Sequence, residues 1–180
     1  MEKEVIRILK RSFKGNKSIV FMIGDDAKSE KRFDYLLKYS YDKAKLFGKV
    51  FYDDDLQSCA IVLDSRKKRF SLKSILLDIG LVFNVIGFKR LSSVLKREET
   101  INKYHPKGDF IHIWYIGVNP EEQGKGNGSY MLTQIMNHYK GMDFYLETSN
   151  SRNIPFYLKH GFVEKEVLKL GSYDLIMMNK

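Results

Sequence analysis

The stretch that decides the fold is NPEEQGKGNGSYML, from Asn119 to Leu132. It places Gly124, Gly126 and Gly128 at alternate positions, directly before apolar residues that recur at helical spacing. A glycine-rich loop that opens a helix offers bare backbone N–H groups to an anion, and the helix dipole adds partial positive charge. The stretch therefore predicts a phosphate-binding loop.

Two common phosphate loops are excluded by spacing. A Walker loop needs a glycine five positions before Gly124 and a Ser or Thr after Lys125, but Asn119 and Gly126 stand there. The dinucleotide fingerprint needs a third glycine where Ser129 or Met131 stands. On the loop alone, a glycine connection that only turns the chain stays open.

The remaining chain predicts a mixed-sheet α/β or α+β fold in a single domain, residues 1–180. Ser29 is expected to cap a helix, and a helical region between Ser71 and Asn102 is expected to break near Gly87. The expected elements, in order, are a helix at 2–13, a helix after Ser29, strands at 49–52 and 59–64, helices within 71–102, a strand at 109–118, a helix after the glycine loop, a strand at 143–149, a short helix at 153–160 and two closing strands around Gly171.

A second motif lies downstream in LETSNSRNIPFYLKHGF, Leu146 to Phe162. Asn153 and Tyr157 are four positions apart and therefore share one face of the short helix. With Gly161 and the Gln-x-x-Gly-x-Gly loop, this motif resembles the GNAT family of N-acetyltransferases, most closely its puromycin N-acetyltransferase branch. The resemblance covers roughly residues 110–162.

The resemblance implies a central twisted mixed sheet whose middle strands splay apart, flanked by helices. It implies an acceptor-side half at 1–108 and an acetyl-CoA-binding half at 109–180. Backbone groups of Ile116 and Val118 would pair with the pantetheine arm. The residues that it assigns to acetyl-CoA are Ile116, Gly117, Val118, Gln123, Gly124, Lys125, Gly126, Asn127, Gly128, Ser129, Asn153 and Tyr157.

The implied reaction is direct attack of a primary amine on the thioester in a ternary complex, without a metal. A main-chain N–H near Val118 would stabilise the oxyanion, and Tyr157 would protonate the leaving thiolate. The implied acceptor is a small amine or antibiotic, although protein lysines and N-termini stay open.

The general base is assigned less directly than the acid. Glu147 lies on the strand beside the expected cleft and is the first candidate, acting directly or through water. His112 is the second candidate and Tyr115 the third. Glu147 has the alternative of a structural carboxylate paired with Arg152.

Composition limits the partners. The net charge is +9, from 31 Lys and Arg against 22 Asp and Glu, which favours an anionic partner: a phosphorylated cofactor, nucleic acid or a membrane surface. The charge is scattered, with its densest cluster at residues 65–70, and this disfavours a nucleic-acid-binding domain. A non-catalytic acyl-CoA sensor stays open.

Two further features bear on location. The apolar run at residues 75–88 is shorter than the roughly twenty residues that span a bilayer, so a buried or lid-like helix is expected there. The N-terminus has no apolar signal core, and the single cysteine, Cys59, is expected as a small buried hydrophobe; both favour the cytoplasm. A monomer and a homodimer are both compatible with the sequence.

Overall fold

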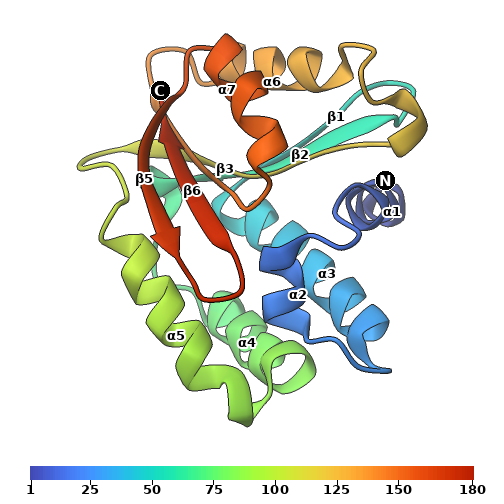
Figure 1. The fold of residues 1–180 in the computed structure, drawn as a ribbon, viewed down its shortest axis with the longest axis vertical. Helices are drawn as coiled ribbons and strands as arrows, with labels where there is room; N and C mark the ends of the chain where they lie inside the picture. The colour runs from blue at the N-terminus through green and yellow to red at the C-terminus, as the bar shows by residue number, and fades with distance from the viewer.

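A six-stranded sheet runs through the computed structural model, which describes residues 1–180 (Figure 1). Its strand order is β1-β2-β3-β4-β6-β5; β3 and β4 pair in parallel and all other neighbours pair antiparallel. This is the mixed α/β fold that the sequence predicts. The strands are β1 (Gly48–Tyr52), β2 (Ser58–Asp64), β3 (Phe110–Val118), β4 (Asp143–Thr148), β5 (Val163–Lys169) and β6 (Asp174–Asn179).

Helices cover both faces of the sheet (Figure 1). On one face lie α6 (Asn127–His138) and α7 (Ile154–Lys159). The helices on the other side are α1 (Glu2–Ser12), α2 (Lys17–Ile23), α3 (Ser29–Phe47), α4 (Leu72–Leu81) and α5 (Phe88–Asn102). A π-helical segment, Val82–Ile86, joins α4 to α5, which starts after Gly87 at a φ of 69°, so the predicted break lies at that glycine.

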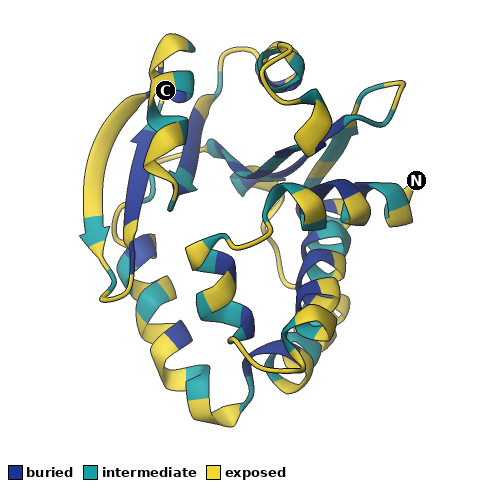
Figure 2. Ribbon diagram, turned by 45° about the vertical axis from the view of Figure 1, so that its right-hand side comes forward, coloured by how far each residue is buried: buried dark blue, intermediate teal, exposed yellow.

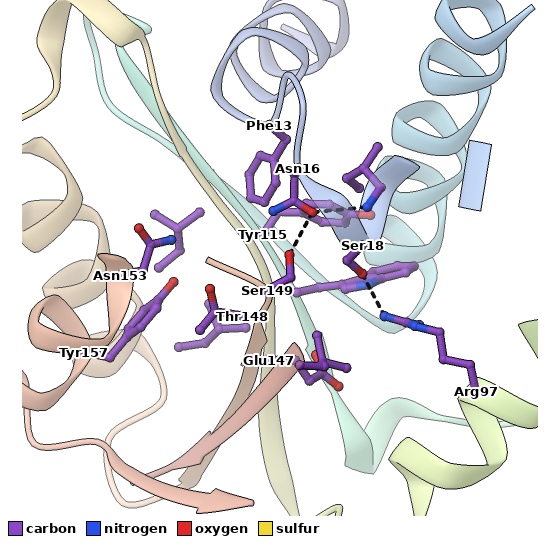
Figure 3. A pocket seen from close by; sticks show the side chains of 15 residues that line it. Phe13, Asn16, Ser18, Arg97, Tyr115, Glu147, Thr148, Ser149, Asn153 and Tyr157 are labelled. Carbon is purple, nitrogen blue, oxygen red and sulfur yellow. Dashed lines mark hydrogen bonds between the residues drawn. The ribbon is translucent and has the colours of Figure 1, made fainter. Parts of the chain in front are cut away.

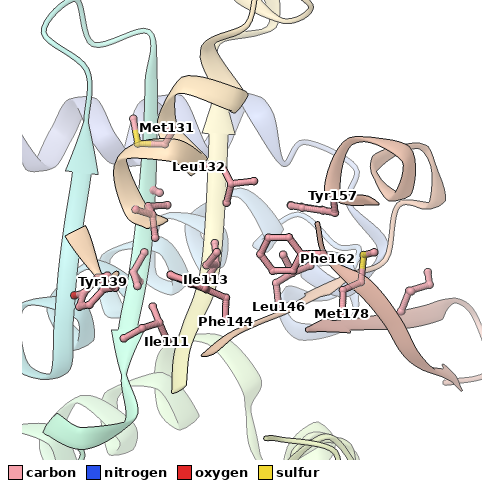
Figure 4. Packing of buried hydrophobic residues seen from close by; sticks show 14 residues of the cluster. Ile111, Ile113, Met131, Leu132, Tyr139, Phe144, Leu146, Tyr157, Phe162 and Met178 are labelled. Carbon is pink, nitrogen blue, oxygen red and sulfur yellow. The ribbon is translucent and has the colours of Figure 1, made fainter. Parts of the chain in front are cut away.

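The alternation of strand side chains builds one core on each face. From β2, Ala60 and Val62 face α6 and α7, whereas Cys59 and Ile61 face α1 and α3. Figure 4 shows the core on the side of α6 and α7, which includes Ile113, Leu132 and Tyr157. Cys59 is fully buried, and burial raises the pKa of its thiol. The buried faces of both helical layers therefore meet across a sheet that is apolar on both sides, as Figure 2 shows in its buried strands.

The register of β3 shifts by one residue at Trp114, between the pairs Ile61–Tyr115 and Val62–Ile113. An extra residue in one strand reverses which face the following side chains occupy. Ile113 accordingly belongs to the α6 core, whereas Tyr115 belongs to the α1–α3 core. The bulge thus bends β3 at the start of the part of the strand that has no neighbour on the β4 side.

Beyond this point β3 and β4 separate. They pair only at Phe110–Asp143, Ile111–Phe144 and His112–Tyr145, so the rest of β3 has no neighbour on that side. The resulting opening in the middle of the sheet is the splay that the sequence resemblance implies. It positions the site described below.

Three local expectations need correction. Ser29 is the first residue of α3 and follows Lys28, which provides no side-chain cap. Helix α2 was not expected; Asn16 starts it by accepting a hydrogen bond from the Ile19 N–H at 3.1 Å. The run at residues 75–88, expected as a buried or lid-like helix, is buried only in part: Val85 and Ile86 are buried, whereas Leu76, Phe83 and Phe88 are exposed. No helix has the length and apolarity required to cross a bilayer.

Candidate active site

The glycine loop opens α6 as the sequence predicts. Gly124 and Gly126 have φ angles of 79° and 94°, a backbone region in which residues other than glycine are strained. Gly126 is the N-cap of α6, and no side chain caps this helix end. The backbone N–H groups from Gly124 to Ser129 donate to no protein acceptor. A run of free N–H groups at a helix start fits a pyrophosphate.

A cavity of about 510 Å³ lies against this loop. Its wall brings together most of the residues predicted to bind acetyl-CoA, from β3, the loop and α7. These are Ile116, Val118, Gln123, Gly124, Gly126, Gly128, Ser129, Asn153 and Tyr157.

Three predicted cofactor residues lie outside the wall of this cavity. A Cβ on Gly117 would lie 2.8 Å from Leu9 of α1, so this glycine permits close packing of α1 on β3. The Lys125 ammonium pairs with Glu122 at 2.9 Å, and the Asn127 side chain donates to the Glu122 carbonyl at 3.3 Å. The two loop side chains therefore brace the loop from outside.

The backbone of Val118 faces the opening between β3 and β4. Its N–H donates to the Ser12 hydroxyl at 3.2 Å, and its carbonyl accepts from the Gln123 side chain at 3.2 Å. Alternate residues of a strand direct their backbone groups to the same side, so Ile116 faces the opening as well. An extended ligand arm that pairs with this edge has to replace the Ser12 and Gln123 contacts.

Helix α7 positions Tyr157 and Asn153 side by side on one wall of the site (Figure 3). The helix ends at Lys159. Gly161, two residues further on, has a φ of 84° that allows the chain to turn back, and Phe162 then packs its ring 5.8 Å from that of Tyr157. Tyr157 is 9% exposed, and burial raises the pKa of its hydroxyl to about 12. The hydroxyl therefore keeps its proton at neutral pH.

Glu147 and His112 form a partly buried pair across the splayed strands. The Glu147 Oε2 lies 2.9 Å from the His112 Nε2, whereas His105 Nε2 lies 3.9 Å from the other carboxylate oxygen. Burial alone would raise the pKa of Glu147, but the charge and hydrogen bond of His112 outweigh it, with help from Arg97, and bring the pKa to about 2. Glu147 makes no ion pair with Arg152, so the alternative pairing expected from sequence is wrong.

Glu147 lies where the cavities meet. A small cavity of about 100 Å³ contains Tyr157, Asn153 and Glu147 together (Figure 3), and joins the loop cavity through its shared residues. On the other side, Glu147 and Trp114 also line two larger cavities, of about 350 Å³ and 440 Å³. Tyr115, the third base candidate, lines the small cavity and contacts the Ser40 hydroxyl only at 3.5 Å.

The cavity of about 350 Å³ has a mostly apolar wall from α2, α3, α4 and α5. Its charged groups are the carboxylates of Asp78, Glu98 and Glu147 and the guanidinium of Arg97. Lys43 pairs with Asp78 at 2.8 Å, and even with Lys43 counted the carboxylates are in excess. With the His112 ring neutral, the three carboxylates exceed the two cations by one charge, which makes this cavity a local negative site in a chain of net charge +9.

Sequence reasoning missed several residues of this region. Arg97 is bound by Ser18 and Tyr173 at 2.8 Å each, and Asn16 accepts from Ser149 at 3.1 Å, tying α2 to the end of β4. An Asn before an apolar run is an N-cap signal that would have located α2. No local pattern marks Arg97, because its partners are far away in the sequence.

The sheet opens between two parallel strands, and a loop with free backbone N–H groups lies at the opening. A family model described as the acetyltransferase (GNAT) family matches residues 31–162. The chain therefore belongs to the GNAT acetyltransferase family, whose members use acetyl-CoA as co-substrate.

Individual relatives agree with this assignment. The chain is 38% identical over 64 residues to an uncharacterized N-acetyltransferase of Schizosaccharomyces pombe, a match that covers 33% of this chain and only 26% of that protein. Its fold is similar to the structure described as histone acetyltransferase HPA2 and related acetyltransferase from Corynebacterium glutamicum, with a TM-score of 0.70, 14% identity and coverage of 99% and 90% of the two chains. Arylalkylamine N-acetyltransferase 2 of Aedes aegypti gives a TM-score of 0.65 at 12% identity, with 99% and 93% covered.

The left-handed loop glycines lead to a test of the ligand. Because Gly126 needs a positive φ, Gly126→Ala adds strain of about 1–2 kcal/mol and disturbs the N–H groups. We expect acetyl-CoA to bind roughly tenfold more weakly, measured by calorimetry. Gly171→Ala is the matched control, since Gly171 has a φ of 78° and open space around it in the β5–β6 turn. Equal weakening in both variants would contradict a specific role of the loop.

Proposed function

We propose that this protein transfers the acetyl group of acetyl-CoA to the primary amine of a small molecule, by direct attack in a ternary complex. The observation that carries this proposal is the small cavity lined by Tyr157 and Glu147, which shares Tyr157 with the loop cavity and Glu147 with the negative, apolar-walled cavity. The first half, residues 1–108, builds most of the acceptor side, and the second half, residues 109–180, holds acetyl-CoA. The free N–H groups of residues 124–129 fit its pyrophosphate.

His112 and Glu147 act together in the proposed mechanism. Sequence favoured Glu147 as the base, but a carboxyl group with a pKa of about 2 is a weak proton acceptor at neutral pH. Glu147 instead accepts the Nε2–H of His112, which leaves the His112 Nδ1 without a protein partner and free to take a proton from the substrate ammonium, so that the neutral amine can attack. Glu147 then stabilises the imidazolium that forms.

Two groups handle the negative charge of the reaction. The Val118 N–H faces the opening and stabilises the oxyanion of the thioester carbonyl once the Ser12 hydroxyl is displaced. Tyr157 keeps its proton at neutral pH and donates a hydrogen bond to the sulfur as the thiolate leaves. Asn153, one helical turn before Tyr157, steadies the thioester end of the arm.

The acceptor cavity supports an amine with an apolar body. Its apolar wall, which includes Leu36, Leu81 and Trp114, favours an aliphatic or aromatic group, and its carboxylates favour the ammonium. Resemblance of the two motifs to the puromycin branch, and similarity in fold to an arylalkylamine N-acetyltransferase, support a small amine as well. The body of an apolar amine contacts the apolar wall without burying an unpaired charge. A polycation would have to lose the hydration of its charges against the same wall.

The test has two steps. Saturating acetyl-CoA is expected to raise the unfolding midpoint, since ligand at about 100 times its dissociation constant stabilises by about 2.7 kcal/mol and each kcal/mol is worth roughly 2–4 °C here. ATP and NAD serve as controls. CoA release is then followed with phenethylamine, tryptamine, ethylamine, spermidine and a lysine peptide.

We expect kcat/KM for phenethylamine and tryptamine to exceed that for ethylamine by roughly tenfold or more, because the aromatic body fills the apolar cavity. Binding of acetyl-CoA without release by any amine would favour the non-catalytic sensor. Absence of any midpoint shift would remove the basis of the proposal, and a higher kcat/KM for spermidine or the peptide would overturn the acceptor class.

A further inference from the structure

The segment from Phe70 to Phe88 exposes an unusual amount of apolar surface. Leu72, Leu76, Phe83 and Phe88 are each between 66% and 72% exposed, and Phe70 is 80% exposed. Ile75 and Ile79 are exposed as well, and the rings of Phe83 and Phe88 contact each other edge to face at 5.3 Å. Single exposed apolar residues are ordinary, but contiguous patches of this kind mark interaction sites.

Helix α4 presents this surface because its amphipathic faces are reversed. Its polar residues Ser74, which is buried, and Asp78, which is half exposed, face α3: the Lys43 ammonium donates to Ser74 at 2.6 Å, and the Tyr39 hydroxyl donates to Asp78 at 2.8 Å. Its apolar residues at 72, 75, 76 and 79 share the opposite face and contact solvent. The apolar stripe is therefore not the core-facing side of a surface helix.

Unpaired positive charges border the apolar stripe. Lys67, Lys68 and Arg69 precede it, Lys73 lies on its flank and Lys89 follows it; all five are exposed and none forms an ion pair. No Asp or Glu occurs between Asp64 and Asp78, and Asp78 is bonded to Lys43. An apolar stripe bordered by cations is the pattern of a helix that lies in the interface of an anionic membrane.

We propose that the face formed by residues 67–89 docks on the surface of an anionic lipid bilayer, with α4 in the interface plane. Leu72, Leu76 and Phe83 enter the boundary between headgroups and acyl chains, and the lysines contact lipid phosphates. Helices α4 and α5 lie at the end of the molecule opposite to α6 and α7, so membrane contact leaves the glycine loop accessible (Figure 1). This inference does not depend on the proposed acetyl transfer.

Two other occupants fit this face less well. In a two-fold symmetric dimer the same face meets itself, so the five unpaired cations of each copy enter one interface and cost repulsion. A nucleic acid would pair its phosphates with the lysines, but it offers nothing to the apolar side chains of Leu76 or Phe83. An anionic bilayer satisfies the charges and the apolar stripe together.

The test is co-sedimentation of the full chain with vesicles of phosphatidylcholine, alone and mixed with phosphatidylserine. We expect binding to the mixed vesicles only. The double variant Leu76→Ser/Phe83→Ser is expected to partition roughly a hundredfold more weakly, at about tenfold for each buried apolar side chain. The triple variant Lys67→Gln/Lys68→Gln/Arg69→Gln is expected to weaken binding about fivefold for each charge removed.

Matched controls separate this docking from general effects. Tyr130→Ser/Leu158→Ser removes exposed apolar side chains from α6 and α7. Lys14→Gln/Lys140→Gln/Lys165→Gln removes three exposed charges elsewhere. Both control variants should bind the vesicles like the parent chain. Unchanged unfolding midpoints show that the variants fold. The proposal is overturned if the parent chain ignores mixed vesicles, if Leu76→Ser/Phe83→Ser converts a dimer into a monomer, or if an oligonucleotide binds through the lysines independently of Leu76 and Phe83.

Discussion

Tyr157→Phe is expected to lower kcat for acetyl transfer by roughly a hundredfold while the affinity for acetyl-CoA stays close to that of the parent. The substitution removes one hydroxyl and keeps the ring that packs on Phe162. Because the pKa of Tyr157 is about 12, above the ~8.5 of a free thiol, the hydroxyl does not transfer its proton completely to the thiolate. Its contribution is a hydrogen bond to developing charge, worth about 1.5–3 kcal/mol.

Tyr139→Phe provides the control for this variant. Tyr139 is also buried in the core beneath α6, and its hydroxyl has no hydrogen-bond partner. Its removal should leave stability unchanged or slightly higher, and kcat unaffected. CoA release under saturating acetyl-CoA and amine measures kcat, and calorimetry measures binding. Full activity of Tyr157→Phe would eliminate the hydroxyl from the reaction.

His112→Gln is expected to lower kcat/KM by about 10²–10⁴-fold, because in the proposed mechanism His112 takes the proton of the substrate ammonium. Glu147→Gln keeps a hydrogen bond to His112 but cannot stabilise the imidazolium, and a loss of roughly 10- to 100-fold is expected. The pH profile separates the two roles. A carboxylate with a pKa of about 2 contributes no acidic limb near neutral pH, so any such limb should vanish in His112→Gln.

The stability of the pair gives an independent check. Glu147 has a folded-state pKa of about 2, below the ordinary 4.5, so its ionised form stabilises the fold above pH 4.5, and this contribution is lost as the pH falls towards 2. The free energy of unfolding, measured with denaturant, should therefore fall over this pH window by more in the parent chain than in Glu147→Gln. An acidic limb that survives in His112→Gln but disappears in Glu147→Gln would return the role of base to Glu147.

The sequence predicted those parts of the fold that depend on local backbone demands. Gly124, Gly126 and Gly161 stand where the chain requires positive φ, and such requirements appear as spacing in the sequence. The order of strands and helices followed from apolar periodicity, which is likewise a local feature of the sequence. Helix α2 was not predicted, because it is short and Asn16 was not recognised as its N-cap.

The direction of an amphipathic helix was not predictable in this way. The apolar run at 75–88 suggested burial, but Lys43 and Tyr39 of α3 bind the polar side of α4 and so turn its apolar side outward. Periodicity identifies the two faces of a helix, whereas its neighbours decide which of them is buried.

What the sequence by itself determined is the mixed fold, the anion loop and the helix that holds Tyr157, because each rests on residues within a few positions of one another. Only the tertiary structure decided the pairing of His112 with Glu147, because these residues are 35 positions apart on separate strands. It also decided the separation of β3 from β4 and the excess of carboxylates in the apolar-walled cavity of a basic chain. The physical reason is that burial and electrostatic contact depend on distances in space, which a sequence pattern does not contain.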